Sequence, residues 1–280
     1  MSRLRIRHRT GFTYDGNVTA SYNEARMLPA TLDHQLVLFS KITVSPPAVQ
    51  HHYSDYWNTR VQAFELLEQH RELSLTAESL VEVRPAAHEP ESLGWEALPR
   101  AVERSTSLVD HLAATKLTAP PSEVSERARD IAAAADNPTA AAETICTLVH
   151  ESVEYRPGAT TVSTTAAEAW QSRAGVCQDI AHLALGALRA AGIPARYVSG
   201  YLHPVADAAI GETVIGESHA WVEWFDGVWR GYDPTNAISI GDRHVVVGRG
   251  RDYSDVPPLR GVYAGPASTL FVTVEITREA

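Results

Sequence analysis

The sequence lacks any long apolar run. None of its 280 residues belongs to an apolar stretch of the roughly 18 or more residues that a membrane-spanning helix needs. The N-terminus, MSRLRIRHRTGF, alternates arginine with apolar residues and never reaches the apolar stretch that a signal peptide requires. We therefore expect a cytoplasmic protein that has no membrane partner.

Positive charge is also in short supply. Lysine and arginine total 24 against 34 acidic residues, which gives a formal net charge of −10 at pH 7. Nucleic acids and anionic membranes both bind clustered positive charge, so neither is an expected partner. Arg3, Arg5, Arg7 and Arg9 alternate with apolar residues, and this pattern is typical of the solvated face of a strand rather than of a binding patch.

The sequence contains only two cysteines, Cys146 and Cys177. Two cysteines cannot form a disulfide framework. Cys146 lies in AAETICTLVHESV, on the buried face of a predicted helix, and is interpreted as a structural thiol. Cys177 instead opens a helix. Cys177 and His182 would provide only two metal ligands at unsuitable spacing, and no calcium-binding loop of alternating Asp and Asn is visible. We expect neither a metal nor another cofactor.

Four segments are predicted along the chain. Residues 1–85 contain short strands separated by Gly, Pro, Asn and Asp clusters, a pattern typical of a β-sandwich or small barrel. Residues 86–125 form a connector with a helical segment. Residues 126–240 combine alanine-rich helices with strands and form the predicted catalytic core. Residues 241–280 form a loop and a closing strand, TLFVTVEIT.

The segment that begins at Cys177 reads CQDIAHLALGALRAAG, and its apolar residues recur at helical spacing until Gly192 and Pro194. Cys177 thus lies in the first turn of a buried helix, where unpaired N–H groups and the helix dipole stabilise a thiolate. Gly175 allows the backbone to come close to whatever approaches the sulfur. Asp179 is interpreted as a partner of the helix N-terminus, because as a third acid it would oppose the thiolate. A cysteine at a helix start is weak evidence by itself.

A predicted hairpin supplies a second group of residues. Its strands are HAWVEWF, from His219, and VWRGYDPT, from Val228, joined around an Asp-Gly pair. A two-residue Asp-Gly turn would set His219 opposite Pro234. A three-residue loop that also includes Phe225 would set His219 opposite Asp233, with β-carbons about 4.5–5.5 Å apart. The sequence is compatible with both turns; we predict the second, because only that turn pairs His219 with a carboxylate.

A thiol, an imidazole and a carboxylate that holds the imidazole are the groups that nucleophilic acyl transfer requires. His219 would take the proton of Cys177 and later protonate the leaving amine, while Asp233 would fix the tautomer and orientation of His219. On the predicted register Trp221 faces Gly231, and its indole would exclude water from the pair. The predicted catalytic residues are therefore Cys177, His219 and Asp233. The alternative is that His219 and Asp233 only satisfy each other within a hairpin.

Four sequence blocks surround these residues: GVCQD (175–179), GIPARYVSGY (192–201), HAWVE (219–223) and DPTN (233–236). Together they closely resemble the bacterial transglutaminase-like cysteine enzymes. HRTGFTY and the residues that follow to about 84 resemble the β-rich N-terminal domain that precedes the core in those proteins. GRGRDYSDVPPLRGVYAG resembles their C-terminal segment, so the resemblance covers nearly the whole chain.

The resemblance implies an α+β fold, with a papain-like, transglutaminase-like core and an N-terminal all-β domain. In that core a helix carrying the cysteine packs on an antiparallel sheet carrying the histidine and aspartate. The implied reaction is attack on a carboxamide or peptide amide, giving a thioester. Water then makes the enzyme a peptidase or amidase, and an amine makes it a transamidase; family members do either.

We favour hydrolysis of a protein or peptide amide, because nothing in the sequence shows the exclusion of water that efficient transamidation needs. The remaining alternative is a scaffold that keeps the fold without turnover. The sequence leaves the oligomeric state open.

The sequence gives only candidates for the oxyanion donors and for the substrate-binding residues around Cys177, His219 and Asp233, which we call the triad. The Cys177 N–H is one natural oxyanion donor, and the Gln171 amide or the Trp170 indole is a candidate for the second. The candidates for lining the substrate cleft are Trp221, Tyr201 and Gln178. The segment 203–218 carries three acids, and it is either a flap that selects basic substrates or a solvated loop.

The chain departs from the family in one turn of the β domain. Where the family commonly shows Asp-x-x-Gly-Asn, this chain reads Asp55-Tyr-Trp-Asn58. We expect this difference to leave the triad untouched.

Overall fold

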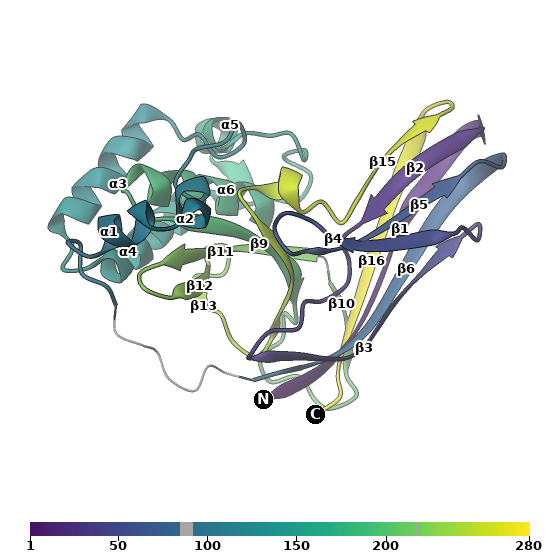
Figure 1. The fold of residues 1–280 in the computed structure, drawn as a ribbon, viewed down its shortest axis with the longest axis horizontal. Helices are drawn as coiled ribbons and strands as arrows, with labels where there is room; N and C mark the ends of the chain where they lie inside the picture. The colour runs from purple at the N-terminus through teal and green to yellow at the C-terminus, as the bar shows by residue number, and fades with distance from the viewer. Residues whose placement is uncertain (85–91, 217) are drawn as a thin grey trace.

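The computed structural model describes residues 1–84, 92–216 and 218–280. Figure 1 shows two halves side by side, with long strands in one half and helices packed on a smaller sheet in the other. The two termini lie together at one end of the long strands, where Arg3 exchanges backbone hydrogen bonds with Glu279 and Ala280. None of the described helices is both long and apolar enough to span a bilayer.

The long-stranded half is a β-sandwich. Its strands are β1 (Ser2–Val18), β2 (Ala20–Ala25), β3 (Gln35–Ser45), β4 (Gln50–Ser54), β5 (Arg60–Leu66), β6 (His70–Val83), β10 (Thr213–Gly216), β15 (Leu259–Ala264) and β16 (Ser268–Arg278). They form one sheet in the order β10-β16-β1-β6-β3 and a second in the order β15-β2-β5-β4. Buried side chains from both sheets, including Tyr14, Phe64 and Leu73, share one core.

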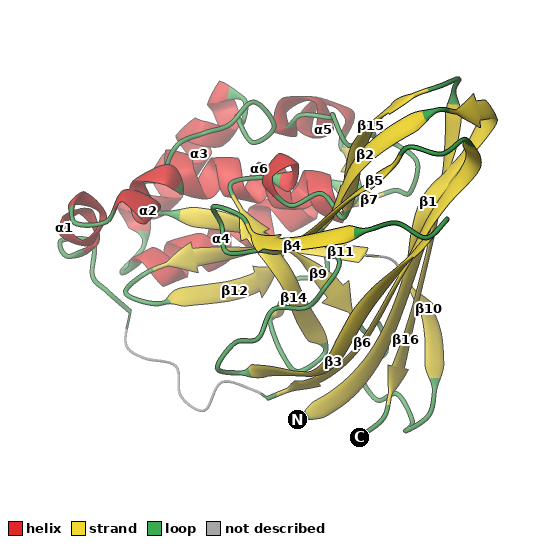
Figure 2. Ribbon diagram, turned by 45° about the vertical axis from the view of Figure 1, so that its right-hand side comes forward, coloured by secondary structure: helices red, strands yellow, loops and turns green. Residues whose placement is uncertain are grey.

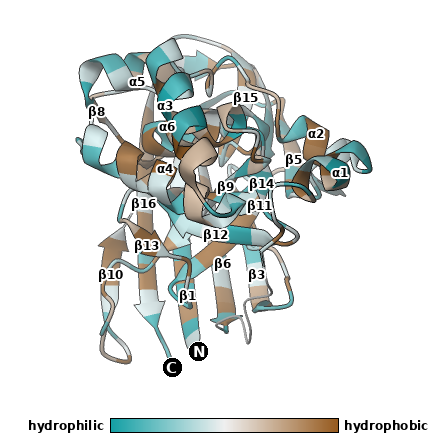
Figure 3. Cartoon of the chain, turned by 90° about the vertical axis from the view of Figure 1, so that its left-hand side faces the viewer, coloured by the Kyte–Doolittle hydropathy of each residue, from teal (hydrophilic) through white to brown (hydrophobic). Residues whose placement is uncertain are grey.

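The alternation of residues along β1 explains how the N-terminal segment folds. Leu4 and Ile6 are buried, whereas Arg5, Arg7 and Arg9 face solvent and pair with glutamates on or next to β6 and β16. Figure 3 shows hydrophilic and hydrophobic residues alternating along these strands. Exposed ion pairs of this kind contribute only about 0–1 kcal/mol each, so burial of the apolar face holds the sheet together. The arginine row is thus a solvated strand face, as predicted.

The second half contains all the described α-helices. They are α1 (Leu98–Glu103), α2 (Thr106–Asp110), α3 (Ser122–Ala134), α4 (Pro138–Ser152), α5 (Ala166–Ser172) and α6 (Cys177–Ala190), and a 3₁₀ turn, η1, spans Tyr253–Asp255. Its main sheet has the order β13-β12-β11-β9-β14, formed by Ile238–Ser239, Trp229–Asp233, Ser218–Phe225, Ala195–Leu202 and His244–Gly250. A small parallel pair consists of β7 (Glu154–Tyr155) and β8 (Ala174–Gly175).

Helix α6 is the centre of this half. It packs on β11 and β9 on one side and against α3, α4 and α5 on the other (Figure 2). Its apolar residues, among them Ile180, Leu183 and Leu188, are almost completely buried. Cys146 lies within the same core on α4 and is fully buried, which agrees with its interpretation as a structural thiol.

The C-terminal residues connect the two halves. Strand β14 pairs with β9 in the catalytic sheet, whereas β15 and β16 complete the two sheets of the sandwich. The predicted closing strand TLFVTVEIT lies within β16, which pairs with β1 along most of its length. A shared apolar cluster joins the halves and includes Ile6 and Ile276 from the sandwich and Tyr201 and Val245 from the catalytic sheet.

The turn at residues 55–58, where the chain departs from the family pattern, is held by its own side chains. Asn58 adopts a φ of 61°, a left-handed conformation that asparagine tolerates better than most residues. The Asp55 carboxylate accepts hydrogen bonds from the N–H groups of Trp57 (3.1 Å) and Thr59 (2.9 Å). The Trp57 ring also packs against His111, with ring centres 5.2 Å apart, so this turn contacts the catalytic half of the chain.

Candidate active site

Cys177 is the first residue of α6, and Asp179 holds the backbone around it. The Asp179 carboxylate accepts hydrogen bonds from the Val176 N–H (2.8 Å) and from the Thr160 hydroxyl. Gly175 permits this approach, because a β-carbon there would lie 2.8 Å from the β-carbon of Asp179. The Cys177 side chain is partly exposed at the positive end of a 14-residue helix, where the dipole favours negative charge.

The thiol, the imidazole and the carboxylate form a continuous chain. Cys177 and His219 line the same cleft, and the interaction with Cys177 raises the pKa of the His219 imidazole. His219 Nε2 lies 2.7 Å from Oδ2 of Asp233, which leaves Nδ1 to face the thiol. The exposed fraction falls along the chain, from the partly exposed Cys177 through 12% for the His219 side chain to 0% for Asp233. The structure thus brings together the three residues predicted to be catalytic.

The hairpin that carries His219 has a register that differs from both predicted ones. Phe225 pairs with Trp229, so the loop consists of Asp226, Gly227 and Val228 rather than beginning one residue earlier. Gly227 occupies the middle of the loop with a φ of 109°. Both predicted registers were wrong because they treated Asp226 only as a turn residue.

Asp226 is in fact fully buried and tied to its surroundings. Its carboxylate accepts hydrogen bonds from Arg230 Nε (2.8 and 2.9 Å) and from the Thr139 hydroxyl, and its carbonyl accepts one from Leu93. In the observed register His219 and Asp233 are diagonal neighbours on one face of the sheet, which long side chains can still bridge.

The register also changes the place of Trp221. Gly231 lies opposite Glu223, so the predicted contact between Trp221 and Gly231 does not form. The indole instead packs on Gly200, where a β-carbon would lie 2.5 Å from the ring. Trp221 is fully buried, with its ring centre 6.2 Å from that of His219. It supports the His219 ring from behind and does not line the cleft.

Both oxygens of Asp233 are occupied by donors. Oδ1 accepts from the N–H groups of Thr235 (2.9 Å) and Asn236 (3.2 Å), and Oδ2 accepts from the Asn236 side chain (2.7 Å) as well as from His219. Asp233 is buried, which raises its pKa, but its hydrogen bonds to His219 and Asn236 and the nearby His244 ring hold the pKa well below its usual range. Asp233 is therefore a carboxylate throughout the physiological range.

Sequence reasoning missed His244 and Asn236 as members of this site. His244 accepts a hydrogen bond at Nδ1 from the Gly241 N–H (3.2 Å), so its Nε2–H points toward Asp233 Oδ2 at 3.6 Å. Asn236 could have been found, since it follows Asp233 in an Asp-Pro-Thr-Asn turn. His244 could not have been found from the sequence, because only the pairing of β14 with β9 brings it near Asp233.

The environment of His219 favours the imidazolium form. Burial by itself lowers the pKa of His219, but the hydrogen bonds to Asp233 and Cys177 and their charges raise it to about 10. A protonated imidazole between a carboxylate and a sulfur is the arrangement expected of an ion-paired nucleophile.

Cys177 and His219 line a cleft of about 240 Å³. It is lined by His8, Thr10, Val162, Val176, Cys177, Gln178, Tyr197, Ser199, Ser218, His219, Ala220, Tyr253, Pro258, Leu259, Leu270 and Val272. Of the three predicted cleft residues, Gln178 lies here and donates a hydrogen bond to the Val162 carbonyl (3.2 Å). Tyr201 lies behind the lining, buried and bonded to His8.

Neither predicted oxyanion donor reaches this cleft. Trp170 is buried in the helical layer, where its indole N–H donates to Glu123 and Arg173 stacks on its ring at 3.7 Å. Gln171 is one residue further along α5 and is therefore rotated into solvent. The prediction was wrong for both residues, because α5 directs Trp170 toward α3 rather than toward Cys177.

The segment 203–218 follows the edge of the sandwich. Its strand β10 pairs with β16, and Arg278 donates a hydrogen bond to the Ala208 carbonyl (3.1 Å). Ser218 is the only one of its described residues that lines the cleft, and Glu217 lies outside the described residues. The segment is thus an edge strand with its connecting loop, and the flap interpretation is wrong for its described part.

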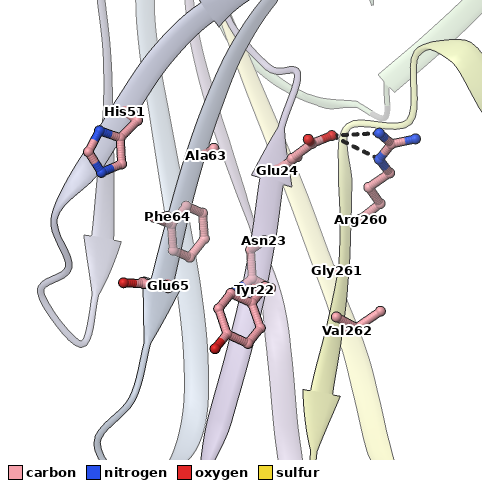
Figure 4. Close-up of a pocket in the computed structure, with 10 residues that line it drawn as sticks. All are labelled: Tyr22, Asn23, Glu24, His51, Ala63, Phe64, Glu65, Arg260, Gly261 and Val262. Carbon is pink, nitrogen blue, oxygen red and sulfur yellow. Dashed lines mark hydrogen bonds and ion pairs between the residues drawn. The ribbon is translucent and has the colours of Figure 1, made fainter.

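A larger hollow of about 480 Å³ lies on the four-stranded sheet of the sandwich (Figure 4). Tyr22, Phe64 and Val262 line it, beside an ion pair between Glu24 and Arg260. It shares no lining residue with the cleft, and its described lining residues include no thiol. Chemistry by a cysteine nucleophile therefore belongs to the smaller cleft.

The fold and this arrangement define a class of protein. An α+β core in which a helix N-terminus presents a cysteine to a His–Asp pair on an antiparallel sheet is the papain-like architecture, here joined to an N-terminal all-β region. The sequence pattern of the transglutaminase-like superfamily matches residues 125–234, and that of the bacterial transglutaminase-like N-terminal region matches residues 4–82. The chain belongs to the transglutaminase-like superfamily, which supports a cysteine-dependent enzyme in general.

Relatives and a solved structure agree with this assignment. The chain is 40% identical over 283 residues to an uncharacterised protein of Mycobacterium leprae strain TN, with 100% of each chain covered. It is 36% identical over 278 residues to an uncharacterised protein of Mycobacterium tuberculosis strain H37Rv, covering 93% of this chain and 87% of that one. A crystal structure of a candidate cysteine protease from Cytophaga hutchinsonii superposes with a TM-score of 0.78 at 20% identity, covering 99% of this chain and 90% of that one. At this identity, the superposition establishes the fold alone.

Proposed function

We propose that this protein is a cysteine-dependent amide hydrolase that forms a thioester between Cys177 and a protein or peptide substrate. The observation that carries the proposal is the chain of contacts from the Cys177 thiol through His219 to Asp233 at the cleft. Membership of the transglutaminase-like superfamily supports a cysteine-dependent enzyme in general.

In the acylation step, the Cys177 thiolate attacks the carbonyl carbon of the amide. The C–N bond then breaks, and His219 gives its Nδ1 proton to the departing nitrogen, so that a neutral amine or ammonia leaves. Asp233 keeps the proton on Nε2 in place and stabilises the imidazolium before transfer. The Cys177 N–H, which has no intrahelical acceptor at the first position of α6, is the natural donor to the developing oxyanion.

In the deacylation step, the sulfur no longer carries a charge. His219 then loses the part of its pKa elevation that comes from Cys177 and becomes a base. It takes a proton from water as the hydroxyl oxygen attacks the thioester carbonyl, and the acid product leaves with the thiolate restored. The partial exposure of Cys177 favours water as the acceptor, since solvent reaches the thioester.

A casein assay tests this function and separates it from transamidation. The purified protein is incubated with N,N-dimethylated casein, whose lysines are blocked, with and without monodansylcadaverine. Mass spectrometry then distinguishes chain cleavage or conversion of glutamine to glutamate from amine incorporation.

We expect hydrolysis products that Cys177→Ala abolishes and that Cys146→Ala, the control at the other cysteine, retains. Amine incorporation in excess of hydrolysis would make transamidation the function. A folded protein that yields neither product and no hydroxylamine-trapped acyl group would favour a scaffold.

A further inference from the structure

Part of the cleft wall in front of Cys177 belongs to the β-sandwich. His8 and Thr10 of β1 and Val272 of β16 line the same cleft as Cys177 and His219. None of these sandwich residues takes part in the acyl-transfer steps above. Side chains from outside the catalytic half that line a catalytic cleft are placed to contact the substrate.

His8 is held in one tautomer by two further groups. Its Nδ1 lies 3.0 Å from the Tyr201 hydroxyl, and that hydroxyl donates a hydrogen bond to the Met27 carbonyl oxygen (3.1 Å). A phenol carries one proton, so the arrangement that satisfies all three groups has His8 donating through Nδ1–H to the Tyr201 oxygen. The second ring nitrogen, Nε2, is then a hydrogen-bond acceptor.

The Nε2 atom of His8 has no partner within the described residues, although it is buried. The whole residue is only 1% exposed. Burial lowers the pKa of His8 to about 4, so the ring is neutral at physiological pH and Nε2 keeps its lone pair. Buried polar atoms are almost always hydrogen-bonded, and an unpartnered acceptor at a cleft wall indicates a partner that arrives with the substrate.

We propose that His8 Nε2 accepts a hydrogen bond from a backbone N–H of a polypeptide substrate, so that the sandwich forms part of the substrate site. This inference rests on the proposed function, because it takes the cleft to hold the acyl donor. A peptide backbone is the substrate class that combines N–H donors with neighbouring apolar groups. Val162, Leu270 and Val272 supply the apolar surface for such groups, since their exposed fractions are 60%, 57% and 48%.

Three covalent probes test the inference without a known substrate. They are acetyl-leucyl-alanyl chloromethyl ketone and two analogues in which one or the other amide nitrogen is methylated. The second-order rate of Cys177 alkylation is measured by mass spectrometry for each probe and for iodoacetamide, which has no peptide backbone and reports on the thiolate alone.

We expect the wild-type protein to react about tenfold more slowly with one of the two methylated analogues than with the parent probe, the loss expected for one hydrogen bond. In His8→Phe, which keeps a ring but has no acceptor, the parent probe should slow by a similar factor and the preference should vanish. Tyr201→Phe, which frees the tautomer of His8, should reduce the preference without removing the ring. His70 is another buried histidine of the sandwich and does not line the cleft, so His70→Phe should keep the preference for the parent probe.

The iodoacetamide rates distinguish failure of the His8 inference from failure of the proposed function. The same iodoacetamide rate in wild type and His8→Phe shows that the triad is intact, so that a change in peptide preference belongs to His8. Equal reaction of the wild-type protein with all three probes, or an undiminished preference in His8→Phe, would overturn the inference while leaving the proposed function in place. Failure of the proposed function would instead show as slow, ordinary iodoacetamide kinetics of Cys177 in the wild type.

Discussion

Asp233 is the residue whose surroundings constrain the site most tightly. Its Oδ1 faces two backbone N–H groups, and its Oδ2 faces His219 and the Asn236 amide. An asparagine at this position would have to turn its NH₂ group toward donors in either orientation. With NH₂ toward His219, the ring would have to accept at Nε2 and would place its proton on Nδ1, which could then no longer take the thiol proton.

Substitution of Asp233 by asparagine therefore tests the tautomer. We expect Asp233→Asn to lower kcat/KM at neutral pH by about 10³–10⁴-fold through the wrong tautomer, and His219→Ala to lower it about 100-fold further. Steady-state kinetics on the hydrolysed substrate measure both variants. Full activity in His219→Ala would remove His219 from the mechanism.

The raised pKa of His219 predicts a pH-dependent contribution to stability. The pKa in the folded protein, about 10, lies above the ordinary value of 6.5, so the stabilisation is fully present below pH 6.5 and is lost as the pH rises through 10. The pKa of Asp233 is shifted in the opposite direction. Because it is lowered, the contribution of Asp233 to stability is present at neutral pH and is lost only in acid.

Urea unfolding of wild type and His219→Gln measures this contribution. The difference in the free energy of unfolding should be largest near about pH 5–6 and should shrink toward pH 10. A difference that does not change with pH would contradict the ion pair.

At the scale of elements, the N-terminus of α6 and the hairpin show what the sequence could and could not predict. The helix and Cys177 at its first turn were predicted from the apolar spacing and the break at Gly192 and Pro194, because helix starts and ends depend on local residues. The hairpin was predicted, but its register was wrong, since buried contacts of Asp226 with Arg230 and distant residues set the turn.

Substitution of Gly175 tests how strongly the backbone at the start of α6 controls the reactivity of the Cys177 thiol. In Gly175→Ala the new β-carbon would lie 2.8 Å from the Asp179 β-carbon, so Asp179 would lose its bond to the Val176 N–H. We expect a loss of about 1–3 kcal/mol in unfolding free energy and slower alkylation of Cys177. Gly216→Ala is the control, since a β-carbon there meets nothing within 4 Å. Equal stability and reactivity in both variants would show that the approach of Asp179 is unimportant.

At the scale of the whole molecule, the two halves form one unit. The shared cluster contains side chains from β1, β6 and β16 and from β9 and β14, and burial of each such side chain stabilises by about 1.5–3 kcal/mol. The sequence predicted the α+β class and the β-rich N-terminal region. It could not predict that residues 259–278 return to that region or that His8 joins the cleft, because both depend on pairings between strands distant in the chain.

Truncation of Ile276 tests whether the halves unfold together. Ile276→Ala, in the sandwich, should cost about 2–5 kcal/mol and should shift unfolding of both halves equally. Tryptophan fluorescence reports mainly the catalytic half, where Trp221 and Trp224 are buried, and far-UV circular dichroism reports the whole chain. Separation of the two unfolding curves would contradict a shared core.

The central claim, that Cys177 is a nucleophile paired with His219, is tested most directly by the rate of iodoacetamide alkylation against pH. Mass spectrometry would follow Cys177 and the fully buried Cys146 in wild type and in His219→Ala. The account predicts that Cys177 reacts rapidly well below pH 8, that this reactivity is lost without His219, and that Cys146 stays unreactive in the folded protein. If Cys177 titrates like an ordinary thiol and is unaffected by His219→Ala, the ion pair and the proposed function are contradicted.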